Sequence, residues 1–161
     1  MIELLAPIIA FFGIFIGVML KKIAEEEIKF GKFGARYFIW MKRIILTLLI
    51  IAIVHFSEDY LYLLIGIIIG LIIGIFLSEY FFLGLSIASS LANSSMLLIT
   101  SSLIFLYGLP YGSIFRKMRL NHLMLIVILF FAPLLLLLFN VNQSLLIGIS
   151  AGGLFQYIIR K

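Results

Sequence analysis

Long apolar runs, separated by short polar segments, dominate the pattern of residues along this chain of 161 residues. The runs are about twenty residues long, which is the length that an α-helix needs to cross the hydrocarbon core of a bilayer. Within them Leu, Ile and Phe follow one another without the alternation that a half-buried strand has. The candidate spans are residues 4–20, 37–56, 60–78, 81–108, 122–139 and 143–159.

The composition makes lipid the natural solvent of this chain. Hydrophobic residues make up 65% of it and charged residues 12%, with a mean hydropathy of +1.30, whereas a soluble domain is about one quarter charged. We therefore predict an all-α fold: one integral membrane helix bundle, residues 1–161, with about six transmembrane segments. The chain has no cysteine, which excludes disulfides, thiolate metal sites and a cysteine nucleophile.

Two segments resemble each other and indicate an internal repeat. YLYLLIGIIIGL at 60–71 is similar to NQSLLIGISAGG at 142–153, and each follows an apolar run and a short polar turn. The similarity predicts two three-helix units, residues 1–78 and 81–161. Because a unit of three spans ends on the opposite side of the membrane from where it starts, we expect the two units to be inverted relative to each other.

Basic residues gather at the ends of the apolar runs, where they favour anionic lipid headgroups rather than nucleic acid as partners. They are Lys21, Lys22, Lys29, Lys32, Arg36, Lys42 and Arg43 around the first connection, and Arg116, Lys117 and Arg119 before the fifth run. Cytoplasmic loops carry the excess of Lys and Arg, so the first connection is predicted to be cytoplasmic, with the N-terminus outside the cell membrane. Two more basic residues, Arg160 and Lys161, stand at the C-terminus. Six full spans would place seven of the twelve basic residues inside and five outside, a distribution that fits the positive-inside rule poorly.

The run at 81–108 contains the densest polar stretch of the chain, SIASSLANSSMLLITSS at 86–102. Seven of its nine polar side chains fall on one side of a helical projection, which predicts one continuous amphipathic helix. These seven are Ser86, Ser89, Ser90, Asn93, Ser94, Thr100 and Ser101. The alternative is a re-entrant hairpin that turns near residues 93–95. The distribution of charge favours this alternative, since the hairpin would bring all twelve basic residues to the cytoplasmic side. We favour the continuous helix.

This polar face has two interpretations, which belong to different classes of function. In the first, it lines the path of a small carrier or channel, with Asn93 as the central contact and Glu79 at one mouth, where it could be linked to proton movement. In the second, it packs against other helices, as do rows of glycine that let backbones approach closely. The glycines are Gly13, Gly17, Gly66, Gly70, Gly74, Gly148 and Gly152. We favour the carrier or channel; the alternative is an assembly subunit that forms a homo-oligomer or binds a membrane-protein partner.

Several motifs for catalysis are absent from the sequence. It contains no HExxH, no Gly-rich phosphate loop and no pair of intramembrane aspartates. An enzyme acting on lipid phosphates would need a metal-binding carboxylate cluster or an oriented nucleophile–base pair beside the basic residues. We therefore lean against an enzyme and expect no metal and no cofactor.

Overall fold

The computed structural model describes residues 2–24, 32–114, 120–139 and 141–159, and the side chains within 5–20, 37–112, 123–139 and 141–159. Every regular element in these ranges is a helix, which confirms the all-α prediction. The elements are α1 (Ile2–Ala24), α2 (Lys32–His55), α3 (Tyr60–Ile73), α4 (Glu79–Ser90), α5 (Ser94–Ile114), α6 (Leu120–Phe131), the 3₁₀ helix η1 (Ala132–Phe139) and α7 (Gln143–Ile159).

Two of these helices are long and apolar enough to cross a membrane by length and composition, over Tyr37–His55 and Ser94–Gly112. The shorter apolar stretches are Leu5–Leu20, Tyr60–Ile73, Leu123–Phe139 and Gln143–Ile159. The bundle of six spans and its place in a membrane therefore remain predictions.

The continuous helix predicted for residues 81–108 is wrong, because the chain leaves the helix after Ser90 and starts a new one at Ser94. The side chain of Asn93 accepts hydrogen bonds from the backbone N–H groups of Ser95 (3.0 Å) and Met96 (3.2 Å), which is how an N-cap residue starts a helix. An Asn side chain that bonds its own backbone in this way competes with continuation of the helix. The break falls at the position of the alternative hairpin.

Helices α4 and α5 run antiparallel to each other. Glu79, at the start of α4, is hydrogen-bonded to Tyr107, near the end of α5, and the rings of Tyr80 and Tyr111 lie edge to face at 4.9 Å. Ser86, Ser89 and Ser90 on α4 are nevertheless buried, as are Thr100 and Ser101 on α5, and one helical phase fits these residues on both sides of the turn.

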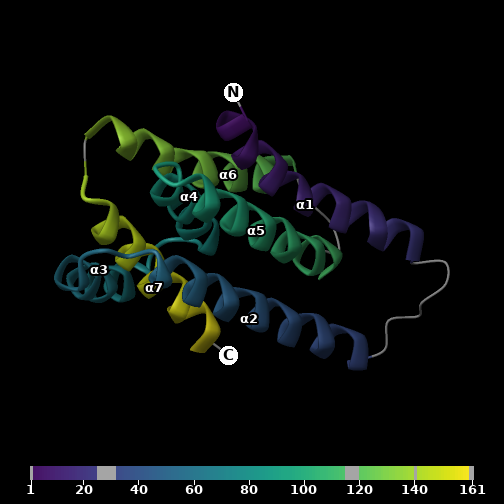
Figure 1. Cartoon of the computed structure of the whole chain (residues 1–161). Helices are drawn as coiled ribbons and strands as arrows, with labels where there is room; N and C mark the ends of the chain where they lie inside the picture. The colour runs from purple at the N-terminus through teal and green to yellow at the C-terminus, as the bar shows by residue number, and fades with distance from the viewer. Residues whose placement is uncertain (1, 25–31, 115–119, 140, 160–161) are drawn as a thin grey trace.

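Helices α3 and α7 form a close parallel pair (Figure 1). A Cβ atom built on Gly66 would lie 2.5 Å from the carbonyl oxygen of Leu145 and 2.9 Å from the Cα atom of Gly148. The contact is reciprocal, since a Cβ on Gly148 would meet the carbonyl oxygen of Leu63. Gly66 and Gly148, which are 82 positions apart, meet directly, so the two LLIG segments lie side by side.

Helices α1 and α5 form a second parallel pair of the same kind. Gly13 lies against the backbone of Phe105 and Gly17 against that of Leu109, while Gly112 lies against Ile14. The inverted arrangement expected for the two units is therefore incorrect, since α1 runs in the direction of α5 and α3 in that of α7. The physical reason is the turn at Asn93, which adds one reversal of chain direction between the units.

Helix α4 occupies the interior between these pairs. Every residue from 82 to 90 is buried, and α4 packs against α5, α6, η1 and α7. The backbone of Gly84 approaches that of Phe130 so closely that a Cβ would clash with its carbonyl oxygen. A segment that is rich in hydroxyl groups thus forms part of the core, whereas apolar side chains such as Phe76 and Leu138 are 82% and 77% exposed on the surface.

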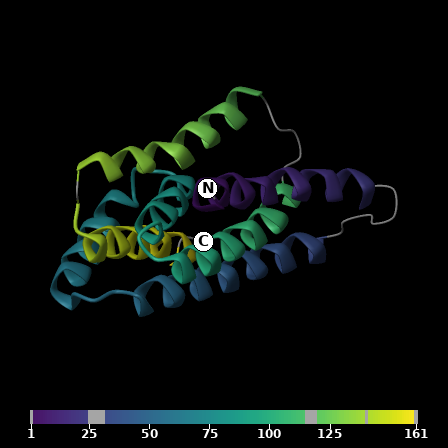
Figure 2. The same cartoon turned by 45° about the horizontal axis from the view of Figure 1, so that its top comes forward.

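The helix ends that flank residues 25–31 and 115–119 lie at one end of the molecule. In Figure 2, α1 and α5 end towards the right, and α2 and α6 begin there. At the opposite end, the backbone N–H of Asp59 donates to Ser144 (3.1 Å), and Gln143 donates to the carbonyl of Ser89 (3.0 Å). The latter contact joins the start of α7 to the end of α4.

Candidate charged site between α2, α4 and α5

A lysine and a glutamate from separate helices meet inside the bundle. The ammonium nitrogen of Lys42 on α2 lies 3.3 Å from Glu79 Oε1 and 3.4 Å from Oε2. The two side chains are 20% and 12% exposed. These distances are longer than the 2.7–2.9 Å typical of a strong ammonium–carboxylate hydrogen bond, so the pair is formed but is not tightly bonded.

Tyr107 holds the carboxylate from the other side. Its hydroxyl donates a hydrogen bond of 2.6 Å to Glu79 Oε2, and its side chain is 1% exposed. A short bond to a charged acceptor is stronger than a neutral one. Glu79 is thus held by α5 and only loosely paired with α2.

Aromatic rings surround the ammonium group. Lys42 Nζ lies 4.5 Å from the ring centroid of Tyr111 and 5.2 Å from that of Tyr107, both within the range of a cation–π interaction. The two rings stack at 6.0 Å, and Tyr80 packs edge-on against Tyr111. We call Lys42, Glu79, Tyr80, Tyr107 and Tyr111 the charged site.

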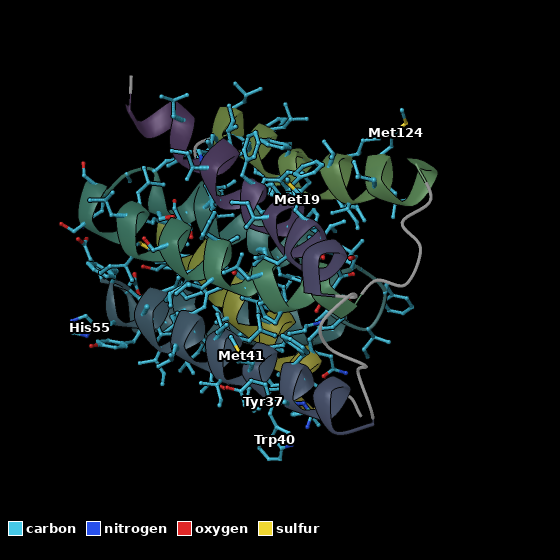
Figure 3. The ribbon with its side chains drawn as sticks, turned by 90° about the vertical axis from the view of Figure 1, so that its right-hand side faces the viewer. Met19, Tyr37, Trp40, Met41, His55 and Met124 are labelled. Carbon is cyan, nitrogen blue, oxygen red and sulfur yellow. The ribbon has the colours of Figure 1, made fainter. Side chains whose placement is uncertain are left out.

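Local sequence explains how these side chains converge. Tyr107 and Tyr111 are four residues apart and therefore share one face of α5. Ser78 caps α4 by accepting from the N–H of Tyr80 (3.4 Å), which fixes Glu79 in the first turn. On α2, Figure 3 shows Tyr37 and Trp40 pointing away from the bundle, and they are 66% and 60% exposed, so the opposite face carries Lys42 inwards.

The sequence prediction identified only part of this site. The sequence analysis places Glu79 at a mouth and Lys42 among the lipid headgroups, whereas the structure brings the two side chains together. The three tyrosines were missed. Their signal was weak but present: a lysine inside an apolar run is expected to have a partner, and tyrosines with i,i+4 spacing share a helix face.

The serines of α4 use their hydroxyl groups within the core. Ser89 donates to the carbonyl of Ser86 (2.9 Å), as does Ser90 (2.7 Å). Ser86 and Ser150 of α7 lie 2.5 Å apart, and both approach the carbonyl of Phe82. Such bonds to the preceding turn and to a neighbouring helix are typical of packing.

The other predicted polar residues do not converge on these serines. Asn93 and Ser94 are exposed at the turn between α4 and α5. Thr100 and Ser101 are buried on α5, and their hydroxyls have no hydrogen-bond partner among the described residues. Ser101 borders a groove of about 440 Å³ whose other walls include Ala6 and Leu98.

The predicted packing glycines all lie against other helices of the same chain. They are Gly13 and Gly17 on α1, Gly66 and Gly70 on α3, Gly74 directly after α3, and Gly148 and Gly152 on α7. Four further glycines, at 84, 108, 112 and 153, lie at equally close contacts. The glycine rows are therefore filled within one chain.

Most of the predicted headgroup residues lie outside the described side chains: Lys21, Lys22, Lys29, Lys32, Arg36, Arg116, Lys117 and Arg119. Arg43 is described and half-buried, beside a surface pocket that Trp40 and Thr47 also line.

Among the side chains that the structure describes, no three His, Asp or Glu residues are grouped as a metal site would require. No protein-family model, no curated protein and no solved structure matches the chain. Chemically, the charged site offers one carboxylate, one phenol that donates to it and ring faces that attract a cation. It can hold a cation or exchange a proton.

Proposed function

We propose that this chain is a small multi-pass membrane carrier that moves a cation in exchange for protons, with Glu79 as the cation- and proton-binding group. The observation that carries the proposal is the Lys42–Glu79 pair, held by Tyr107 where α2, α4 and α5 meet. In membrane bundles, ionisable residues that face the interior mark ion pathways and proton relays.

The distribution of apolar side chains supports a membrane location. Large apolar residues are exposed along α1, α2, α3, α6 and η1, while buried positions include serines and a threonine. Soluble monomers rarely expose apolar patches of more than a few hundred Å². A bundle with this pattern is stable where lipid covers its surface.

Charge supports one orientation of the bundle. With the turn at Asn93, the helices reverse direction so that both basic connections and the chain's basic C-terminal residues belong to the same side, and all twelve Lys and Arg residues are then cytoplasmic. The positive-inside rule favours this arrangement and puts the N-terminus outside. The chain would cross seven times, with α3 and α4 as short crossings of 14 and 12 residues.

Short helices and repeats are common in carriers. We take α1–α3 and α5–α7 as two repeats in the same orientation, joined by α4, because α1 pairs with α5 and α3 with α7. Carriers built from repeats bind substrate at the repeat interface, near the ends of helices that stop inside the membrane. Glu79 starts such a helix, and it contacts one residue from each repeat.

In this mechanism Glu79 alternates between partners. Ionised Glu79 pairs with Lys42 or with the transported cation, and protonated Glu79 releases both. The serines of α4 stabilise the helix that carries Glu79, in place of lining a path. The alternative role as an assembly subunit is disfavoured, because the glycine faces that would bind a partner are occupied within the chain.

Reconstituted vesicles provide the test. Purified protein is placed in liposomes with an acidic lumen and a fluorescent pH probe, and chloride salts of sodium, potassium, ammonium, ethylammonium and choline are added outside. We expect at least one cation to release the proton gradient faster than in empty liposomes, and Glu79→Gln to abolish the effect. Glu58→Gln, an exposed acid at the opposite end, serves as the matched control. If no cation acts on the wild type, or Glu79→Gln transports normally, the proposal is wrong.

A further inference from the structure

We infer that the cation accepted by the charged site is an organic ammonium ion, and that Lys42 is a tethered competitor which occupies the site when no substrate is bound. The inference rests on the proposed function and specifies its substrate class. The structure already holds an alkylammonium group in the site, namely that of Lys42.

The surroundings of this group match those that recognise ammonium ligands. Its nitrogen has a carboxylate at 3.3 Å and two tyrosine rings with centroids at 4.5 and 5.2 Å. Aromatic rings beside a carboxylate are the arrangement that binds methylated and quaternary ammonium groups, because the ring faces attract a weakly hydrated cation. Tyr80 supports the Tyr111 ring from the side.

The same surroundings fit a bare metal cation poorly. Hard cations are bound by several oxygen ligands that replace their hydration shell. Lys42 Nζ contacts the Glu79 carboxylate, one oxygen of which already accepts a hydrogen bond from Tyr107, and the ring faces of Tyr107 and Tyr111. An organic cation loses less hydration on entry and gains contact with the rings.

Lys42 has the properties of a replaceable occupant. It is held at 3.3–3.4 Å from both carboxylate oxygens, in contrast to the 2.6 Å bond of Tyr107. Its side chain is 20% exposed, and its four-carbon stem lets the ammonium swing away without movement of α2. An incoming ammonium ion would take its place while the Tyr107–Glu79 bond stays intact.

The first test is thermal unfolding of the full chain in detergent, with tetramethylammonium chloride or butylammonium chloride compared with sodium chloride at equal ionic strength. We expect a saturable rise in the Tm of the wild type with at least one ammonium salt. Lys42→Met is expected to bind about tenfold more tightly, because removing a resident competitor raises the fraction of open sites. Tyr111→Leu is expected to lose the response, whereas Tyr37→Leu, on the exposed face of α2, keeps it.

The second measurement needs only the wild type, so it stands even if a variant fails to fold. Displacement of Lys42 exposes its amine, so reductive methylation of Lys42, followed by mass spectrometry, is expected to become faster when tetramethylammonium chloride is present, since this quaternary ion does not react with the methylating reagent. An unchanged or slower rate overturns the inference. So does a response of Lys42→Met without any response of the wild type, because Lys42 is then a permanent structural partner.

The two proposals fail separately. If sodium or potassium is transported in a way that depends on Glu79 but ammonium ions do not bind, the proposed carrier function is supported and the proposed organic substrate is wrong. Ammonium binding that requires Tyr111, without transport of any cation, supports the site and overturns the carrier.

Discussion

Tyr107 donates a hydrogen bond of 2.6 Å to Glu79, although the two residues are 28 positions apart and lie on different helices. The bond joins the two arms of the α4–α5 hairpin and fixes the carboxylate of the charged site. It depends on the turn at Asn93, since a continuous helix would separate the two side chains by about 42 Å at 1.5 Å per residue.

Replacing Tyr107 by Phe removes this hydroxyl and keeps the ring. A hydrogen bond to a charged group contributes about 1.5–3 kcal/mol, so we expect a loss of that order in the free energy of unfolding, together with slower cation–proton exchange. Denaturant unfolding in detergent and the vesicle assay measure the two effects. Tyr62→Phe, on an exposed residue of α3, is the control; equal stability of the two variants would contradict the role of the bond.

Removing one partner of the Lys42–Glu79 pair is expected to destabilise the chain more than removing both charges. Lys42→Met leaves Glu79 unpaired, which costs up to about 3–5 kcal/mol for a buried pair and less here, because water reaches Lys42. The double variant Lys42→Met, Glu79→Gln has no unpaired charge and is expected to regain most of the stability. A double-mutant cycle by thermal unfolding checks this, and additive effects would show that the two groups do not interact.

Gly66→Ala is expected to separate α3 from α7. Its Cβ would lie 2.5 Å from the carbonyl oxygen of Leu145, and overpacking of this kind typically costs about 1–3 kcal/mol. Leu64→Ala on the exposed side of α3 should cost far less. Thermal unfolding of both variants measures the two effects. An unchanged Tm in Gly66→Ala would rule out the close parallel pairing.

Ser86→Ala separates packing from transport. The hydroxyl group is bonded within the core, and an interhelical bond of this type contributes about 0.6 kcal/mol on average. We expect a small loss of stability and unchanged cation–proton exchange in vesicles. If a folded Ser86→Ala variant lost cation–proton exchange, the serine-rich segment would instead line the transport path.

Single cysteines test the orientation, because the chain has no cysteine of its own. Ser95 and Ser113 lie near opposite ends of α5. With a membrane-impermeant maleimide on intact cells, we expect Ser95→Cys to be labelled and Ser113→Cys to be labelled only after the membrane is opened. Labelling of Ser113→Cys from outside would contradict the arrangement with seven crossings.

The sequence predicted some features because they depend on local pattern. Apolar runs predicted the helices, and the LLIG segments at 63–66 and 145–148 lie in two helices that pack side by side. The prediction of one continuous helix was wrong at Asn93, because the polar residues before and after the turn fit a single helical phase. The sequence also gave no partner for Lys42, because periodicity shows which face of a helix is polar but not which other helix that face meets.

By itself, then, the sequence determined that this protein is all-helical, with an apolar surface, close-packed glycine rows and one polar segment, since each follows from residue type and spacing within a single helix. Only the tertiary structure decided that the polar segment folds back on itself, that α1 pairs with α5 and α3 with α7 in parallel, and that Lys42, Glu79 and Tyr107 share one site. These features depend on whether Asn93 caps a new helix or continues the old one. That choice is set by the free energy of packing α4 inside the bundle, to which residues from the whole chain contribute.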